Sequence, residues 1–371
     1  MLQILAAGAG DARAQEPVTV LFDVRWSVML DAPASAAPAF DAGRVYVPLQ
    51  GGQLAAVALE RGELVWSVHA GATLAPAAGQ ALVFVAAANA IRALEAASGR
   101  EMWATTLDDP ITAAPTFDAG WLFVPLENGR LQALRAVDGK ILWSLDAGAA
   151  LHAPPAPAAD RVYLPLADGR VVAVDLQTGE IVWTRRLDAP PSEILPLDDR
   201  LFVGSEDNYF YCLSLDDGRN RWRWRTGGDV VGAPIVDTSR VYFMSRDNLL
   251  RGLDRGGGSM RWQRPVPSRT IGGPLRSGSS IVIASLRPQL HAYQDVTGNP
   301  LGVSPPLEGD ATVNTLIAPP RLVSFEGEDG FVLLARHGVL QLLTFKSEDE
   351  GADPDGSDPG EDEADALDSA P

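Results

Sequence analysis

The chain has 371 residues, of which 46% are hydrophobic and 21% charged, with a formal net charge of −18 and a single cysteine. One cysteine excludes an internal disulfide and a cysteine-based zinc cluster. A strongly acidic chain is a poor partner for the phosphate backbone of nucleic acid. No apolar run reaches the roughly 18 residues that a membrane-spanning helix needs, so we expect no transmembrane segment.

Residues 1–17 form a leader with an ambiguous composition. The stretch MLQILAAGAG is mildly apolar, and Ala12-Arg13-Ala14 is similar to the small-residue end of a secretory signal. The basic start of such a signal is missing, and the apolar part is short. Two interpretations stay open: an incomplete export signal whose start lies upstream of Met1, or a frayed leader. No cysteine near the start offers a lipid attachment site.

A five-residue pattern, Gly-x-x-x-Trp, recurs along the chain. It reads GELVW, GREMW, GKILW, GEIVW, GRNRW and GSMRW, and successive copies lie 37 to 40 residues apart. A fixed period in this range is typical of repeat architectures, in which each unit packs against its neighbours. The repeat, rather than any local motif, therefore decides the fold class.

Other positions repeat in register with the tryptophan. An apolar run such as VYVP (45–48) lies about 18 residues before it, and a second run such as QLAAVAL (53–59) lies between them. The linkers carry Asn-Gly, Asp-Gly or Thr-Gly, which supply the positive φ that short hairpin turns need. Each unit is therefore predicted as four short antiparallel strands of about four to seven residues.

Four antiparallel strands in about 40 residues are typical of one blade of a β-propeller. Seven complete units span 35–66, 75–103, 114–143, 153–183, 190–222, 233–262 and 273–302. An eighth unit, 315–345, has three strands, and the isolated strand 21–30 carries Trp26. We predict an all-β fold over residues 18–346, an eight-bladed β-propeller of four-stranded antiparallel blades. Its N-terminal strand joins the last blade and closes the ring, which removes a free sheet edge.

Packing explains the repeated tryptophan. A four-stranded blade cannot bury both faces alone, and an outer-strand indole covers on the order of 150–250 Å² against the neighbouring blade. We expect one tryptophan per blade to repeat the same seam, and the glycine before it to make the turn into the outer strand. The structural docking set is Trp26, Trp66, Trp103, Trp143, Trp183, Trp222 and Trp262.

The order of proline, VYV, glycine turn, alternating strand and Asp/Thr-Gly-x-x-x-Trp resembles the PQQ-like β-propeller repeat. The hallmark of that family is a tryptophan-docking motif between blades, and the resemblance covers roughly residues 20–345. It implies one of two functions: that of the quinoprotein dehydrogenases, or that of the non-catalytic BamB-like branch, which supports outer-membrane β-barrel assembly. The chain has the length of the second branch, with almost all of it used for the ring.

The residues favour the non-catalytic branch, with no enzyme activity and no cofactor. The dehydrogenases that the repeat resembles stack their quinone on a pair of adjacent cysteines, whereas Cys212 is alone. It occupies the column that Ala133, Ala173 and Ala292 hold in other units, so we interpret it as a small core residue. The connections between blades are short, so they provide few residues that could enclose a small-molecule pocket. A quinone-dependent dehydrogenase, or a degenerate quinone-binding relative, remains the alternative.

No other motif indicates a metal site or a nucleophile. The sequence contains no Gly-x-Ser-x-Gly, P-loop or HExxH motif. The Asp-Asn pairs at 207–208 and 247–248 align with the hairpin turns of other units, which favours turn chemistry over calcium binding. Because none has a metal-ligand spacing, we expect structural or solvent-exposed roles for His69, His152, His291 and His337.

One region departs from the acidic balance of the chain. Residues 185–290 hold sixteen arginines against twelve acidic residues. Within this region RNRWRWRT (219–226) alternates arginine with tryptophan, and a strand places alternate residues on opposite faces. Both residue types are enriched at protein–protein hot spots. The alternative is a solvated outer strand with one docking tryptophan. The hypothesis that stays open beside it is a partner-binding face on blades five to seven, with Arg219, Arg221, Arg223, Trp224 and Arg225 as its candidate residues.

Residues 347–371 form an acidic tail with eleven aspartates or glutamates and no lysine or arginine. Low apolar content and dense like charge predict that this tail is disordered. Two roles stay open for it: a solubilising extension, or an electrostatic gate that folds back on the basic blades.

Together these features predict a non-enzymatic, monomeric ring that binds one or more protein partners. The resemblance implies a partner among the outer-membrane assembly components and a location in the bacterial periplasm, while the sequence leaves a cytoplasmic location open. The residues at repeated positions are explained by packing between blades and not by recognition, so they do not identify the partner.

Overall fold

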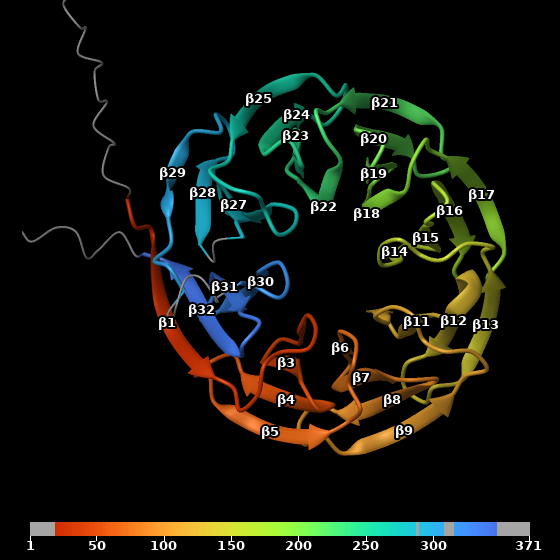
Figure 1. Ribbon diagram of the computed structural model, residues 1–371. Helices are drawn as coiled ribbons and strands as arrows, with labels where there is room; N and C mark the ends of the chain where they lie inside the picture. Colours follow the sequence, from red (N-terminus) through yellow and green to blue (C-terminus); the bar gives the residue numbers. More distant parts are fainter. Residues whose placement is uncertain (1–18, 287–288, 308–314, 347–371) are drawn as a thin grey trace, which may run out of the picture.

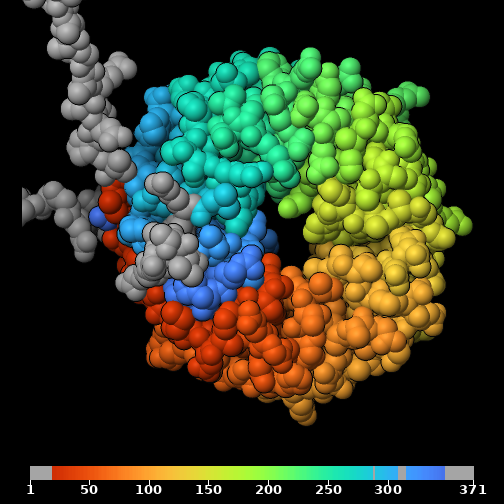
Figure 2. All heavy atoms as spheres, in the orientation of Figure 1, coloured from red at the N-terminus to blue at the C-terminus, as the bar shows by residue number. Residues whose placement is uncertain are grey.

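The computed structural model describes residues 19–286, 289–307 and 315–346. Its strands form eight four-stranded antiparallel sheets around one axis (Figure 1), and the space-filling view shows a narrow opening near that axis (Figure 2). The predicted eight-bladed, all-β propeller is therefore confirmed. The predictions for residues 1–17 and for the tail 347–371 lie outside the described residues. Within the described ranges, no helix is long and apolar enough to cross a membrane.

Each blade runs from an inner strand near the axis to an outer strand at the circumference. Blades one and two comprise β2 (Ala39–Phe40), β3 (Arg44–Leu49), β4 (Gln53–Ala58), β5 (Leu64–His69), β6 (Ala77–Gly79), β7 (Leu82–Ala87), β8 (Ala90–Glu95) and β9 (Glu101–Thr106). Blades three and four comprise β10 (Thr116–Asp118), β11 (Trp121–Pro125), the 3-10 turn η1 (Glu127–Gly129), β12 (Arg130–Arg135), β13 (Ile141–Asp146), β14 (Ala156–Ala158), β15 (Arg161–Pro165), β16 (Arg170–Asp175) and β17 (Ile181–Arg186).

The second half of the ring continues in the same order. Blades five and six comprise β18 (Pro191–Leu197), β19 (Arg200–Ser205), β20 (Tyr209–Ser214), β21 (Asn220–Arg225), β22 (Val230–Val236), β23 (Arg240–Ser245), β24 (Leu249–Asp254) and β25 (Met260–Pro265). Blades seven and eight comprise β26 (Leu275–Ser277), β27 (Ser280–Ala284), β28 (Leu290–Gln294), β29 (Pro300–Val303), β30 (Arg321–Phe325), β31 (Glu328–Leu334), β32 (Val339–Phe345) and β1 (Phe22–Met29).

The first strand of the chain completes the last blade, as predicted. β1 pairs antiparallel with β32, from Phe22 opposite Phe345 to Met29 opposite Val339. The red and blue ends of the described chain therefore lie side by side (Figure 1). The Phe22 ring is buried, with its centroid 4.5 Å from that of Phe345 and 5.6 Å from that of Phe331. The closing strand is thus fixed by both a backbone ladder and an aromatic cluster.

Five inner strands are shorter than the predicted four to seven residues. β2, β6, β10, β14 and β26 have two or three residues each. Proline has no N–H for a sheet ladder, so a strand tends to begin after it. Each of the five strands begins directly after a proline, namely Pro38, Pro76, Pro115, Pro155 or Pro274. In β18 and β22 the pairing continues beyond a register shift, and these two inner strands reach seven residues.

The core lies in the seams between blades. In the seam between blades eight and one, Val45 and Val57 pack in one cluster with Val332, Leu340 and Leu342. Neighbouring blades cover both faces of the second and third strands of each blade. These strands therefore read as nearly continuous apolar runs rather than as alternating ones.

The two ends of the ring carry different loops. We call one end the crossover face: it carries the turns between the second and third strands, together with the loops that lead to the next blade. We call the other end the terminal face, because Thr19 and Lys346 lie there beside the remaining hairpin turns. Residues far apart in the sequence can therefore meet only if their loops share a face.

Candidate partner-binding surfaces

The same type of hydrogen bond recurs in seven of the seams between blades. The indole N–H of an outer-strand tryptophan donates to a backbone carbonyl of the next blade, with N···O distances of 2.8–3.3 Å. The pairs are Trp26 with Leu59, Trp66 with Ala96, Trp103 with Ala136, Trp143 with Leu176, Trp183 with Leu215, Trp222 with Arg255, and Trp262 with Asp295. All seven tryptophans of the predicted docking set therefore lie between blades and not on an exposed surface.

The repeat glycine of the next blade lies against each of these indoles. At Gly179 the backbone has φ +74°, and a Cβ added there would lie 2.7 Å from Cδ2 of Trp143. Gly62 has the same relation to Trp26, again at 2.7 Å from the ring. The glycine therefore makes the turn and also provides the bare surface on which the indole packs. The sequence interpretation covered only the first of these roles.

The seam between blades seven and eight has no tryptophan, so the expectation of one per blade is wrong there. Gly302 of β29 pairs with Ala292, in the position that a tryptophan holds in other blades. The N-terminal segment fills the space: Val303 N–H donates to the Thr19 carbonyl and Leu21 N–H to the Val303 carbonyl, both at 2.9 Å. A Cβ on Gly302 would lie 2.4 Å from the Thr19 oxygen. Backbone hydrogen bonds thus replace the indole contact.

The predicted partner-binding strand is β21, the outer strand of blade five. Arg221, Arg223 and Arg225 are exposed, whereas Trp222 and Trp224 are half-buried. Both tryptophans pack against the apolar cluster between blades five and six. The arginines therefore face solvent, and Trp224 supports the strand from beneath rather than presenting its ring outward.

Two arginines of this segment are neutralised locally. Arg219 forms an ion pair with Asp217 at 3.2 Å, and Arg221 forms one with Asp199 at 2.6 Å. The bond from Arg221 holds the pKa of Asp199 below its usual range. Both pairs lie at the surface, where an ion pair contributes little to stability. A partner that contacts these arginines would therefore compete with carboxylates of the chain itself.

Arg223 and Arg225 are more available. The Arg223 guanidinium lies 4.6 Å from the centre of the Tyr209 ring, which is a cation–π contact. Among the described residues, neither Arg223 nor Arg225 has an acidic partner within ion-pair distance. These two side chains are the strongest anchors on β21 for an acidic or aromatic partner surface.

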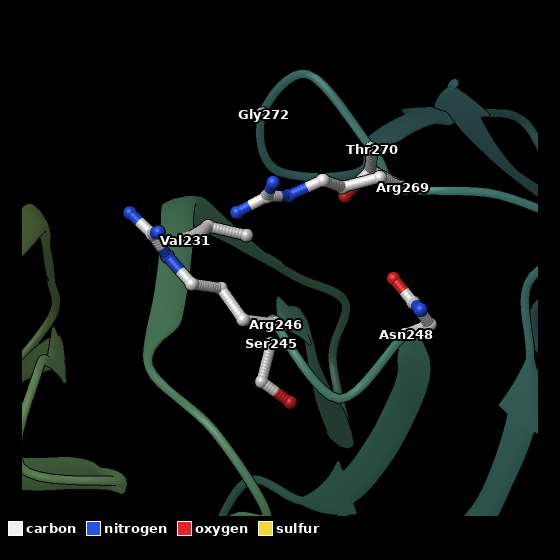
Figure 3. Close-up of a pocket in the computed structure, with 7 residues that line it drawn as sticks. All are labelled: Val231, Ser245, Arg246, Asn248, Arg269, Thr270 and Gly272. Carbon is white, nitrogen blue, oxygen red and sulfur yellow. The ribbon is translucent and has the colours of Figure 1, made fainter. Parts of the chain in front are cut away.

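Two adjoining cavities open on the crossover face over blades four to seven. They share Val231 and Arg246 in their walls. The first, of about 210 Å³, is lined by His152, Ala153, Ser192, Glu193, Glu206, Asp229, Val230, Val231, Gly232 and Arg246. The second, of about 240 Å³, is lined by Val231, Ser245, Arg246, Asn248, Arg269, Thr270 and Gly272 (Figure 3). Sequence reasoning missed these residues as a group. The available signal was the local excess of arginine in residues 185–290, which include Arg246 and Arg269.

The first cavity is mainly acidic. His152 Nε2 lies 3.3 Å from Glu206 Oε1, so this histidine contacts a carboxylate on the crossover face. Glu193 lies on the inner strand β18 and is exposed, yet partial desolvation of its carboxyl group raises the pKa of Glu193. The positive charge of Arg321, on the inner strand of blade eight, opposes that rise. The acidic lining can therefore attract a cationic group, but positively charged or basic side chains of the protein already offset part of its negative charge.

A buried ion pair lies beneath the second cavity. Arg251 is 4% exposed and donates to both carboxylate oxygens of Asp247 and to the Ser245 hydroxyl. Desolvation acts to raise the pKa of Asp247, but the bonds from Arg251 and Ser245 outweigh it and hold that pKa at about 2. Asn248 follows with φ +59°, so the Asp-Asn pair makes a tight turn. The carboxylate is committed to Arg251.

The cysteine and the three other histidines considered in the sequence lie outside these two cavities. Cys212 is fully buried opposite Trp222, and burial raises the pKa of its thiol. Burial lowers the pKa of His291, His337 has a buried Nδ1, and His69 is exposed. Over the described ranges, no three His, Cys, Asp or Glu side chains gather in a way that could hold a metal ion.

Comparisons with known proteins agree with this architecture. The BamB of Legionella pneumophila (strain Paris) is 25% identical over 144 residues, which is 38% of this chain and 34% of that protein. The crystal structure of BamB from Moraxella catarrhalis superposes with a TM-score of 0.70 and 18% identity, over 88% of this chain and 98% of that one. Quinohemoprotein alcohol dehydrogenase from Comamonas testosteroni gives 0.69 and 14%, over 87% and 76%. Both structural likenesses concern the fold.

The sequence pattern of one family covers most of the ring. The family described as "Outer membrane protein assembly factor BamB" matches residues 23–83, 70–195 and 192–305, and these ranges together run from β1 into blade seven. The PQQ-like repeat that the tryptophan spacing resembled is thereby confirmed. On this evidence the chain belongs to the family of outer membrane protein assembly factor BamB.

Proposed function

We propose that this chain is a non-enzymatic binding scaffold, a single ring that supports outer-membrane protein assembly from the periplasm. The family description names this process, and the relatives from Legionella and Moraxella carry the same name. The repeated residues of the ring are used for packing between blades. Recognition is therefore assigned to the side chains in which the blades differ.

One observation carries the proposal to a surface. β21 exposes Arg223 and Arg225 without an acidic partner among the described residues, on a strand that Trp224 fixes from beneath. Arginine on a rigid support pairs strongly with carboxylates and aromatic rings, and it loses little side-chain freedom on binding. The outer strand of blade five is thus proposed to contact an acidic region of an outer-membrane assembly component.

Removing three charges from β21 is expected to abolish capture of that partner. Arg221→Ala, Arg223→Ala and Arg225→Ala are combined in one chain, which is used as bait for the native envelope fraction. The matched control combines Arg100→Ala, Arg135→Ala and Lys140→Ala, which removes three exposed positive charges from blades two and three. Mass spectrometry should find an assembly component with the wild type and the control, at least about tenfold depleted with the β21 variant. Equal capture by all three chains would remove β21 from the proposal.

The competing assignment is a quinone-dependent dehydrogenase, and calorimetry separates the two. A dehydrogenase, or a degenerate relative that keeps the cofactor site, would release or absorb heat on titration with pyrroloquinoline quinone and calcium. The scaffold is expected to give only the heat of dilution. Saturable heat with a one-to-one stoichiometry would overturn the non-enzymatic proposal.

A further inference from the structure

The second cavity, at the junction of blades six and seven, is lined by two guanidinium groups and no carboxylate. Arg246 comes from the β23–β24 turn and Arg269 from the loop between β25 and β26. Figure 3 shows both guanidinium groups on the side of the cavity where Val231 lies, with the Asn248 side chain on the other side. Two separate loops therefore bring positive charge to one hollow.

The charges around this cavity are matched, with one exception. Arg246 forms an ion pair with Asp229 at 3.3 Å, and Arg251 beneath the floor is matched by Asp247. Arg269 forms no ion pair with any described residue. Counted over the residues that the structure describes, the cavity has an excess of one positive charge, which lies on the guanidinium that extends across it.

Close backbone contact fixes the loop that carries Arg269. A Cβ on Gly232 would lie 2.0 Å from the Gly273 nitrogen, and one on Gly273 would lie 2.0 Å from the Ala233 oxygen. These glycines hold the blade-seven loop against the inner strand of blade six. The Arg269 carbonyl also accepts a hydrogen bond from Leu286 N–H at 2.8 Å. Because its backbone is fixed, Arg269 gives up mainly side-chain freedom when it meets a ligand.

We propose that this cavity binds a carboxylate side chain on an acidic segment of a partner protein. Planar guanidinium groups pair with carboxylates through two parallel hydrogen bonds, and such bonds are stronger than neutral ones. The Thr270 hydroxyl and the Asn248 amide line the same cavity and are further donors. The inference rests on the proposed function, since it takes the ligand from a protein partner. It assigns a second contact, nearer the axis than the arginines of β21.

Fluorescence anisotropy with a short labelled peptide tests the site. The probe is a peptide with three glutamates, compared with the same peptide carrying glutamines, titrated at low salt with the full chain. Arg269→Ala is expected to weaken glutamate-peptide binding about tenfold or more, since a charge-assisted bond is lost. Arg269→Lys should restore only part of it, because lysine lacks the planar fork. The control is Arg261→Ala, an exposed arginine of β25 paired with Asp254, which should leave binding unchanged.

The acidic tail 347–371 is itself a glutamate-rich and aspartate-rich segment, so a chain ending at Lys346 is titrated in parallel. This chain keeps β32, which ends at Phe345. Tighter binding to it than to the full chain would support the site and indicate that the tail competes. The proposal would be overturned if each chain bound the glutamate and the glutamine peptide with equal affinity. It would also be overturned if wild type and Arg269→Ala bound the glutamate peptide equally well. Displacement by micromolar inorganic phosphate would also overturn it, because the site would then take a free anion.

The peptide assay and the capture assay fail independently. Loss of peptide preference with normal capture of an assembly component would overturn the cavity and leave the proposed function standing. A clear glutamate preference that depends on Arg269, without any captured assembly component, would overturn the proposed function and leave the carboxylate site.

Discussion

Trp143→Ala is expected to lower the free energy of unfolding by about 3–5 kcal/mol, the usual cost of removing a buried aromatic side chain. The indole is 8% exposed, and its N–H donates to the Leu176 carbonyl at 2.8 Å. Truncation opens a cavity in the seam between blades three and four and leaves that carbonyl without its donor. Urea denaturation, followed by circular dichroism, measures the loss.

Gly179→Ala is expected to lower the free energy of unfolding by about 2–4 kcal/mol, because the new methyl group enters the Trp143 ring at a positive φ. The matched control is Gly51→Ala. Gly51 has φ +80°, close to the +74° of Gly179, but nothing lies within 4 Å of its added Cβ. The control therefore carries only the backbone strain, about 1 kcal/mol.

A double-mutant cycle isolates the contact between glycine and indole. In a Trp143→Ala background the ring is absent, so Gly179→Ala should cost no more than Gly51→Ala does. The expected coupling energy is about 1–3 kcal/mol, the part of the glycine effect that comes from overpacking. Equal costs of Gly179→Ala in both backgrounds would mean that the glycine serves the turn alone.

Deleting residues 1–30 has the largest expected effect, because it removes the outer strand of blade eight. The edge of β32 would lose its whole ladder, from Phe345 to Val339, and the Phe22 ring would leave its cluster. The seams of blade eight with blades seven and one would both lose their N-terminal contacts. An exposed apolar edge strand promotes association between chains. We therefore expect an aggregated or insoluble product.

Deleting only residues 1–18 is the control, since that chain retains all of the described strands. It is expected to remain a soluble monomer in size-exclusion chromatography. A synthetic peptide of residues 19–30, added during refolding, should rescue the longer deletion, and a Trp26→Ala peptide should do so less well. A soluble, folded chain after deletion of residues 1–30 would contradict the role assigned to β1.

The sequence was sufficient for the ring because the same contact is repeated seven times. The eighth unit, 315–345, has only three strands, and Trp26 lies 40 residues before Trp66, so these two features together assigned the first strand to the last blade. The arginine–tryptophan alternation on β21 could also be predicted, since a strand has a period of two. A short motif that is weak evidence in one copy becomes strong evidence for the fold when it recurs at a fixed spacing.

Other features depended on contacts that repetition does not encode. In the sequence, Gly302 indicates only that a tryptophan is missing from that blade. The segment that takes the place of the tryptophan comes from the opposite end of the chain. The crossover-face cavities bring together loops of four blades, from His152 to Thr270. Most of their charged residues stand in turns and in loops between blades, and Glu193 is on the inner strand β18. Charged residues are common in such connections and carry no pattern of their own. The geometry of the ring was needed to group them.

Disulfide formation across the last blade tests directly whether the start of the chain closes the ring. Asp23 lies opposite Thr344 and Val24 opposite Leu343. Adjacent pairs in an antiparallel ladder alternate between two spacings, so at least one of these pairs should suit a disulfide. Each pair is replaced by cysteines in a Cys212→Ala background, which removes the native thiol.

We expect mild oxidation to give an intramolecular disulfide in at least one pair, identified by mass spectrometry as a cross-linked peptide of the two ends. A control with cysteines at 23 and 184, the latter on the outer strand of blade four, should stay reduced. No intramolecular bond in either test pair, or equal cross-linking in the control, would contradict a ring closed by the N-terminal strand.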